Sequence, residues 1–216
     1  MNDKIKATME ALEKNNMSVF YAETAQEASK LALGLIKEGD TISHGGSVTL
    51  SQLGLTEEFK SGKYNYLDRA KPGLTPDEIT EVYRKTFSAD AYFTSSNAVT
   101  VNGELYNVDG NSNRVAAMLF GPAKVIVIVG VNKIVDDVTA AVDRVKRCAA
   151  PQNCVRLDKK TYCSTEGKCV SADKENAYFC DGCTSPDRIC CNYTVMSFQR
   201  TKERVNVIIV NENLGY

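Results

Sequence analysis

Apolar residues recur along this chain with two different spacings, which predict helices alternating with strands. Ile5, Met9 and Leu12 fall at positions i, i+4 and i+7, the spacing of one helix face. Residues 124–131, KVIVIVGV, form a continuous apolar run of strand length, as expected where both faces of a sheet are covered. The same reasoning predicts β structure over 18–23, 40–44, 64–68, 91–108 and 204–212, and helices over 24–39, 48–62, 74–89, 113–121 and 136–150.

Local signals support several of these elements. Thr75, Pro76 and Glu78 together form the clearest helix start, with a capping threonine, a proline at the first helical position and a glutamate that closes the capping box. Asn102-Gly103 lies between two β-rich runs and is a strong signal for a hairpin turn. The alternation of strands with helices predicts an α/β fold with a mainly parallel sheet flanked by helices. We expect one domain over residues 1–216, with a cysteine-rich loop over 148–191 inserted before its last strand.

Charge and composition narrow the range of partners. Apolar residues make up 43% of the 216 residues and charged residues 25%, with a formal net charge of −1. A charge so close to zero gives no reason to expect nucleic acid or an anionic membrane as a partner. The first 16 residues, MNDKIKATMEALEKNN, lack the apolar core of a signal peptide, and no later run is long enough to span a membrane. We therefore expect a cytoplasmic protein.

All eight cysteines lie between positions 148 and 191. In a reducing cytoplasm such clustering favours a metal or iron–sulfur site, with a disulfide framework or unbound thiols as the alternatives. The spacings are Cys163-x5-Cys169, Cys180-x2-Cys183 and the adjacent pair Cys190-Cys191. Thiolates bind zinc, copper(I) or iron–sulfur clusters, and spacing alone does not separate zinc from a cluster.

The turn SHGGSVT, residues 43–49, is the first candidate ligand site. Glycines after a strand let the backbone approach a ligand, and amides at the start of the next helix can bind an anion. Gly45, Gly46 and Ser47 are therefore predicted to bind substrate, with a simple chain turn as the alternative. His44 is the only histidine and is a candidate acid–base catalyst, although a lone histidine is more often structural.

A second candidate site is the turn NVDGNSNR, residues 107–114, which ends one predicted strand and enters a helix. In α/β folds ligands bind at the carboxyl ends of strands. Asp109 is a candidate base, and Arg114 is suited to pairing with a carboxylate or phosphate. The alternative is an Asx turn that caps the helix. The full set of predicted substrate-binding residues is Gly45, Gly46, Ser47, Asn97, Asp109, Gly110, Asn113 and Arg114.

Read together, these stretches resemble the LUD domain family of lactate-utilization proteins. The resemblance is carried by residues 95–135, by APQNCVRL at 150–157, by YCSTEGKC at 162–169 and CTSPDRIC at 183–190, and by the ending RVNVIIVNENLGY. It implies a fold similar to ribose-phosphate isomerases, glucosamine-phosphate deaminases and CoA transferases, with the ligand over glycine-rich strand ends. It also implies Cys163, Cys169, Cys183 and Cys190 as the metal ligands, with Cys180 or Cys191 as possible substitutes.

The resemblance implies a role in the utilization of lactate or a related hydroxy acid, with a [4Fe–4S] cluster or alternatively Zn²⁺ on the cysteine-rich segment. Expected partners are a small-molecule substrate and iron–sulfur oxidoreductase subunits, together with a possible homo-oligomer. Two alternatives stay open at this point. One is a sugar-phosphate or acyl-CoA enzyme with a structural zinc, and the other is a non-catalytic subunit of an oxidoreductase complex.

Overall fold

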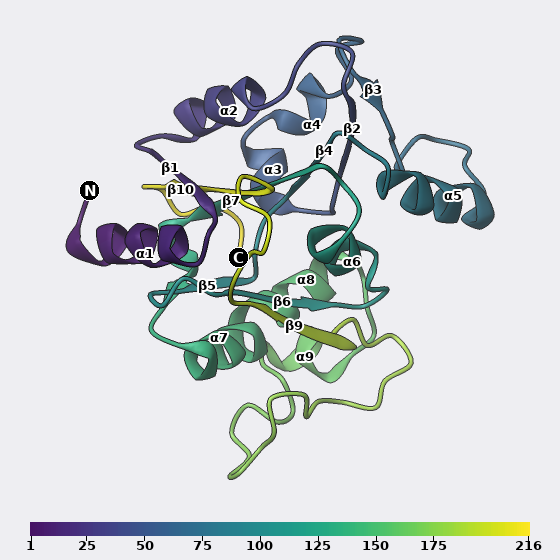
Figure 1. The fold of residues 1–216 in the computed structure, drawn as a ribbon. Helices are drawn as coiled ribbons and strands as arrows, with labels where there is room; N and C mark the ends of the chain where they lie inside the picture. The colour runs from purple at the N-terminus through teal and green to yellow at the C-terminus, as the bar shows by residue number, and fades with distance from the viewer.

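The computed structural model describes residues 1–216 and contains a six-stranded sheet whose neighbouring strands are all parallel (Figure 1). This confirms the predicted fold class. The strand order is β1 (Ser18–Ala22), β10 (Val205–Val210), β7 (Lys124–Gly130), β4 (Ala91–Thr94), β2 (Thr41–His44) and β3 (Asn65–Tyr66).

Strand β7 shows why the central strands have apolar residues at successive positions. Its side chains alternate between the two faces of the sheet, and each face packs against its own core. Val125 and Val127 enter one core, whereas Ile126 and Ile128 enter the other. Both faces of this strand are therefore excluded from water, which is the arrangement that a continuous apolar run indicates.

Helices cover both faces of this sheet. Residues of α2 (Ala25–Gly34), α3 (Val48–Gln52) and α4 (Leu55–Glu58) pack into the core on one face. Residues of α1 (Asp3–Lys14) and α6 (Asn113–Leu119) pack into the core on the other. Helix α5 (Pro76–Thr86) lies at the outer edge beside β3, and Thr75 and Glu78 form its predicted capping box (Figure 1).

A second sheet of four strands, which the sequence did not predict as a separate unit, lies beside the first. Its order is β8 (Ile134–Val135), β5 (Ala98–Thr100), β6 (Leu105–Asp109) and β9 (Asn192–Met196). Strands β5 and β6 are antiparallel, which confirms the hairpin around Asn102-Gly103. One face of this sheet contributes Val99, Leu105 and Met196 to the first core. The other face packs with α7 (Val138–Arg144).

Two predicted helices have different bounds in the structure. The helix expected over 48–62 is broken into α3 and α4 because Gly54 has a left-handed backbone, with φ of 69°. The helix expected over 136–150 begins at Val138, after the capping residue Asp137, and does not stop at 150. It continues through a π-helical turn over Val145–Ala149 into α8 (Ala150–Arg156).

The cysteine-rich segment has more regular structure than the expected loop. Helix α8 and the short helix α9 (Tyr162–Glu166) lie within it, and β9 follows its last cysteine directly. Residues 167–191 are without helix or strand and extend below the second sheet in Figure 1. Nowhere in the chain is a helix both long enough and apolar enough to cross a membrane.

Candidate functional site

A cavity of about 450 Å³ lies where strands of both sheets end. The segments that follow β2, β4, β7 and β10 supply one side of it, and the turn after β6 supplies another. Residues of the cysteine-rich segment line the remaining wall of the cavity. Its lining includes Gly46, Ser47, Thr49, Arg69, Ser95, Asn97, Asp109, Gly110, Asn113, Arg114, Lys133, Arg156, Lys159, Asp187, Arg188, Ile189, Cys191 and Gly215.

Seven of the predicted substrate-binding residues line this one cavity: Gly46, Ser47, Asn97, Asp109, Gly110, Asn113 and Arg114. Gly45 does not line it. A Cβ at Gly45 would lie 3.0 Å from both Arg114 Cδ and the Tyr92 hydroxyl oxygen, so this glycine lets Arg114 pack closely against the end of β2. The two polar turns, far apart in the sequence, therefore meet at one site.

His44, the predicted acid–base residue, lies outside the cavity. Its ring stacks on Tyr66 and packs against Phe59, with centroid separations of 5.8 Å in both cases. Burial lowers the pKa of His44, and Nδ1 lies 2.7 Å from the Gly45 carbonyl oxygen. The neutral imidazole with Nδ1–H donating to this carbonyl satisfies both observations. In this position the ring supports the turn that follows β2.

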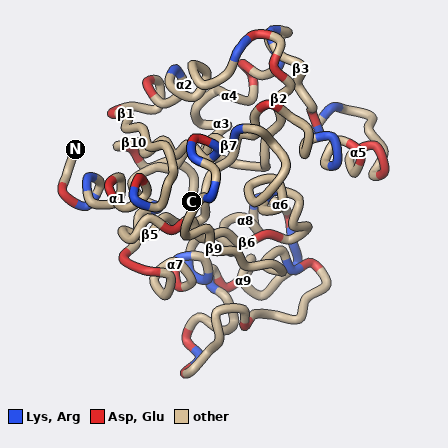
Figure 2. Tube along the Cα trace, in the orientation of Figure 1, with Lys and Arg blue, Asp and Glu red and all other residues tan.

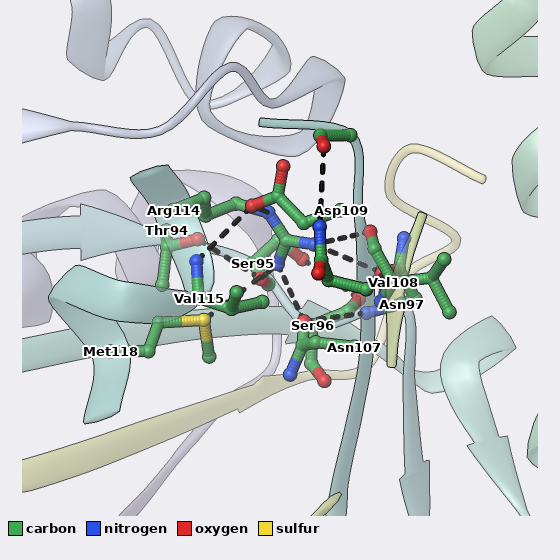
Figure 3. Close-up of polar contacts among 12 residues, drawn as sticks. Thr94, Ser95, Ser96, Asn97, Asn107, Val108, Asp109, Arg114, Val115 and Met118 are labelled. Carbon is green, nitrogen blue, oxygen red and sulfur yellow. Dashed lines mark hydrogen bonds and ion pairs between the residues drawn. The ribbon is translucent and has the colours of Figure 1, made fainter. Parts of the chain in front are cut away.

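Arg114 lies at the centre of the polar contacts shown in Figure 3. Its Nη2 donates to Asn97 Oδ1 at 3.0 Å and to the Val108 carbonyl oxygen at 2.9 Å. Its Nη1 donates to Asn107 Oδ1 at 2.5 Å and to the Ser95 carbonyl oxygen at 3.3 Å. Arg114 therefore uses its terminal donors within the chain. These contacts join the end of β4 to the end of β6 and hold the cavity wall in shape.

Asp109 is also held by the chain. Its Oδ2 accepts a hydrogen bond from the Val115 amide at 3.1 Å and lies 3.8 Å from Arg114 Nε (Figure 3). The carboxylate thus caps the start of α6, as the Asx-turn alternative expected, while it still lines the cavity. Its remaining oxygen lone pairs are available to a ligand hydroxyl.

Lys133 is a cavity residue that the sequence analysis did not single out. It ends the short 3-10 turn Val131–Lys133 that follows β7, and it is 3% exposed. Its Nζ donates to Thr49 Oγ1 at 2.9 Å and to Ser95 Oγ at 3.0 Å. Burial, together with the positive charges of Arg144 and Arg114, lowers its pKa to about 7. The sequence did contain a signal, because Lys133 lies three residues beyond the long buried strand, at the edge of the sheet where α/β folds bind ligands.

Arg69 was missed for a different reason. It lies in an irregular segment after β3, where no pattern indicates a site. Its Nη1 donates to the Tyr83 hydroxyl at 3.1 Å, and its buried Nε has no hydrogen-bond partner. A Cβ at Gly46 would lie 2.5 Å from Arg69 Nη2, so the glycine leaves room for this guanidinium at the cavity.

Six cationic and two carboxylate side chains line the cavity: Arg69, Arg114, Lys133, Arg156, Lys159 and Arg188 against Asp109 and Asp187. Over the rest of the chain the two signs are interspersed, as Figure 2 shows. The excess of positive charge is thus a local property of the cavity. A small anion is the complementary ligand.

A second, much narrower cavity of about 20 Å³ lies against the second sheet and is lined mostly by apolar residues. The cysteines that line it are Cys163, Cys169, Cys183 and Cys190, the four predicted metal ligands, and none of the other four. Cys180 and Cys191 are exposed. The family resemblance and the cavity lining therefore select the same set of cysteines.

All eight cysteines are free thiols, and the side chains as they stand form no group of three or more that could hold a metal ion. Four thiols around one apolar cavity are the donors that a thiophilic metal or cluster prefers. A cavity of about 20 Å³ holds about one water molecule. A single zinc ion would thus require side-chain rotations, whereas an eight-atom cluster would require the segment to open.

Arg188 lies between the two cavities. Its guanidinium donates to the carbonyl oxygens of Cys180 at 2.8 Å, Cys183 at 3.0 Å and Cys190 at 2.9 Å, and the same residue lines the cationic cavity. The Tyr193 hydroxyl contacts Nη2 at 3.0 Å. Arg188 therefore fixes the backbone around two predicted metal ligands and borders the ligand cavity.

Comparison with known proteins agrees with the resemblance seen in the sequence. The model of the LUD domain matches residues 5–210. The chain belongs to the LUD domain family. No curated protein shows significant sequence similarity to it. Among solved structures, a DUF162 family protein from Deinococcus radiodurans is similar to this LUD-family chain, with a TM-score of 0.53, 16% identity and 96% of each chain covered.

Two further solved structures resemble only part of this LUD-family chain. The tetrameric eIF2B-beta2-delta2 complex from C. thermophilum has a TM-score of 0.35 at 24% identity and covers 52% of this chain and 42% of its own. The alpha subunit of a malonate decarboxylase from Acinetobacter baumannii has a TM-score of 0.36 at 15% identity, covering 63% and 34%.

Proposed function

We propose that this chain is a LUD-type protein of hydroxy-acid utilization that binds lactate or a related hydroxy acid in the cationic cavity. We further propose that Cys163, Cys169, Cys183 and Cys190 hold a [4Fe–4S] cluster or, alternatively, a zinc ion. Membership of the LUD family supports the metabolic role. The excess of cationic side chains in the cavity supports an anionic substrate.

One segment of the chain, residues 186–189, connects the two proposed sites. Residues 186–189 lie between the predicted ligands Cys183 and Cys190 and also line the ligand cavity. The Cys191 amide donates to the Asp109 carbonyl oxygen at 3.0 Å, which ties the end of this segment to the cavity turn. A group bound by the cysteines would therefore set the position of one cavity wall, and a ligand there would lie next to the metal site.

The chemistry places requirements on the partner. Oxidation of a hydroxy acid to an oxo acid removes two electrons and two protons, so an electron acceptor is needed, which we propose is an iron–sulfur oxidoreductase subunit. A [4Fe–4S] cluster held by all four cysteines would supply one-electron transfer, whereas Lewis acidity would require that one of the four leaves an iron position open. Asp109, with free oxygen lone pairs at the cavity, is the residue we propose to accept a hydrogen bond from the substrate hydroxyl.

Ligand selectivity tests the proposed substrate class. We expect isothermal titration calorimetry to show binding of L-lactate or another short hydroxy acid, with weaker or no binding of ribose 5-phosphate and acetyl-CoA. The reason is that the lining offers two carboxylates and six cationic side chains within about 450 Å³, which suits a compact anion carrying a hydroxyl. Preferential binding of ribose 5-phosphate or acetyl-CoA would instead support the sugar-phosphate or acyl-CoA alternative.

Metal analysis tests the cysteine site. Protein purified without oxygen is expected to contain about four iron and four sulfide per chain, as one [4Fe–4S] cluster requires. Cys163→Ser is expected to remove most of this metal because it deletes a ligand. Cys148→Ser is the matched control and is expected to retain it, since Cys148 does not line the cysteine cavity. Zinc without sulfide would rule out the cluster and support a structural zinc, and no metal would overturn both.

A further inference from the structure

The Lys133 ammonium lacks a counterion within the chain. Its two hydrogen-bond partners, Thr49 Oγ1 and Ser95 Oγ, are neutral hydroxyls, and it forms no salt bridge. The cations Arg144 and Arg114 disfavour its ammonium form, and only the Cys148 thiol acts in the opposite direction. A buried ammonium without an anion is unfavourable, and proteins rarely keep one without a functional reason.

The position of this ammonium makes it accessible from the cavity. Lys133, Thr49, Ser95 and Gly215 all line the cationic cavity. Gly215 has a left-handed backbone, with φ of 59°, and a Cβ at this position would lie 3.3 Å from Lys133 Nζ. The same Cβ would lie 2.6 Å from Thr49 Oγ1, so a larger residue would press on the Lys133–Thr49 pair, and glycine leaves the space beside the ammonium.

We propose that Lys133, with the Thr49 and Ser95 hydroxyls, forms a carboxylate-binding subsite in the wall of the cationic cavity. This inference rests on the proposed function and specifies which group of the hydroxy acid binds there. The ammonium supplies charged donors for one carboxylate. Thr49 Oγ1 donates to the Leu214 carbonyl oxygen at 3.3 Å and Ser95 Oγ to the Ser96 carbonyl oxygen at 3.4 Å, and each hydroxyl can rotate from this long hydrogen bond to donate to a carboxylate oxygen instead. The substrate hydroxyl would then face Asp109, the carboxylate that lines the same cavity.

Protonation of Lys133 makes the subsite sensitive to pH. Its pKa of about 7 results from burial and from Arg144 and Arg114, and the Cys148 thiol acts in the opposite direction. A bound carboxylate favours the ammonium form and raises the pKa. Binding above pH 7 therefore takes up a proton, and the affinity is expected to fall roughly tenfold per pH unit until the pKa of the bound state is reached.

The test uses titration calorimetry with oxalate, L-lactate, the uncharged analogue L-lactamide and inorganic phosphate. We expect Lys133→Met to weaken oxalate and L-lactate binding about 10- to 100-fold, the range for a lost charged hydrogen bond, with little effect on L-lactamide. Lys124→Met is the matched control, because Lys124 is the first residue of β7 and lies at the end of that strand away from Lys133, and it should leave the binding of all four ligands unaffected. Proton uptake by the wild-type protein, measured in two buffers at pH 8, checks the subsite without any variant.

The outcomes separate this inference from the proposed function. Oxalate binding that depends on Lys133, without any L-lactate binding, would support the subsite and overturn the proposed substrate. L-lactate binding that is equal in wild type and Lys133→Met would overturn the subsite and leave the substrate class standing. Tighter binding of phosphate than of oxalate, or no proton uptake at pH 8, would also overturn the carboxylate subsite.

Discussion

Replacing Arg114 with leucine (Arg114→Leu) is expected to lower the free energy of unfolding by about 3–5 kcal/mol, as when one partner of a buried charged network is removed. The Arg114 side chain is 13% exposed and supplies donors to Asn97 Oδ1, Asn107 Oδ1 and the carbonyl oxygens of Ser95 and Val108. The substitution leaves these acceptors without this partner, and Asn107, which is fully buried and does not line the cavity, has no water to replace it. The loss should be visible in urea denaturation as a lower midpoint.

Two matched variants identify the cause. Arg114→Lys keeps the positive charge, but an ammonium cannot span acceptors from both β4 and β6, so we expect a smaller yet clear loss of stability. Arg84→Leu removes an exposed arginine whose partner, Glu81, is one helical turn away, and its effect should stay within about 0.5 kcal/mol. Equal effects of the Arg114 and Arg84 substitutions would contradict the role that we assign to the buried guanidinium.

Replacing Lys133 with methionine is expected to have the opposite effect on stability. In the ligand-free protein we expect a gain of about 1–3 kcal/mol at pH 6, because an uncompensated buried charge is exchanged for a side chain of similar length that is apolar. This gain should accompany the loss of carboxylate binding described above. A residue that lowers the stability of the empty protein and raises its affinity for a ligand is typical of a functional site.

The pH dependence of this gain has a definite sign. The folded-state pKa of Lys133 is about 7, below its ordinary value of 10.5. Between these two values the unfolded chain binds more protons than the folded one, so wild-type stability rises with pH through this window relative to Lys133→Met. The advantage of the variant should therefore be largest below pH 7 and shrink toward pH 10. Urea denaturation of both proteins at several pH values measures it, and a gain independent of pH would contradict a buried ammonium.

Many elements of the fold were predictable from the sequence because they depend on short-range patterns. Continuous apolar runs such as 124–131 indicate strands covered on both faces. A helix start is indicated by a capping threonine followed by proline and glutamate, as at Thr75, Pro76 and Glu78. Gly54 shows the limit of such patterns. The apolar spacing over 48–62 is helical, and only the left-handed backbone at this residue ends one helix and starts another.

The second sheet could not be predicted in the same way. Strand β9 pairs with β6 across more than 80 residues, and its own sequence, NYTVM, has only one buried residue, Met196. Whether such a segment becomes a strand depends on the edge that β6 presents to it. The cysteine-rich segment was therefore expected to be a loop up to the last strand, although its end adds a strand to the second sheet.

The sequence by itself determined the α/β class, the residues of the two polar turns and the family to which the chain belongs, because each of these depends on residue type and order. Only the tertiary structure decided which side chains have free donors. Arg114 is predicted by its turn, yet its donors are used within the chain, whereas Lys133 follows an ordinary buried strand and is left without a counterion. The physical reason is that the charge balance around a buried group is set by residues from distant segments, such as Thr49, Ser95 and Arg144, which meet only when the sheets close around the cavity.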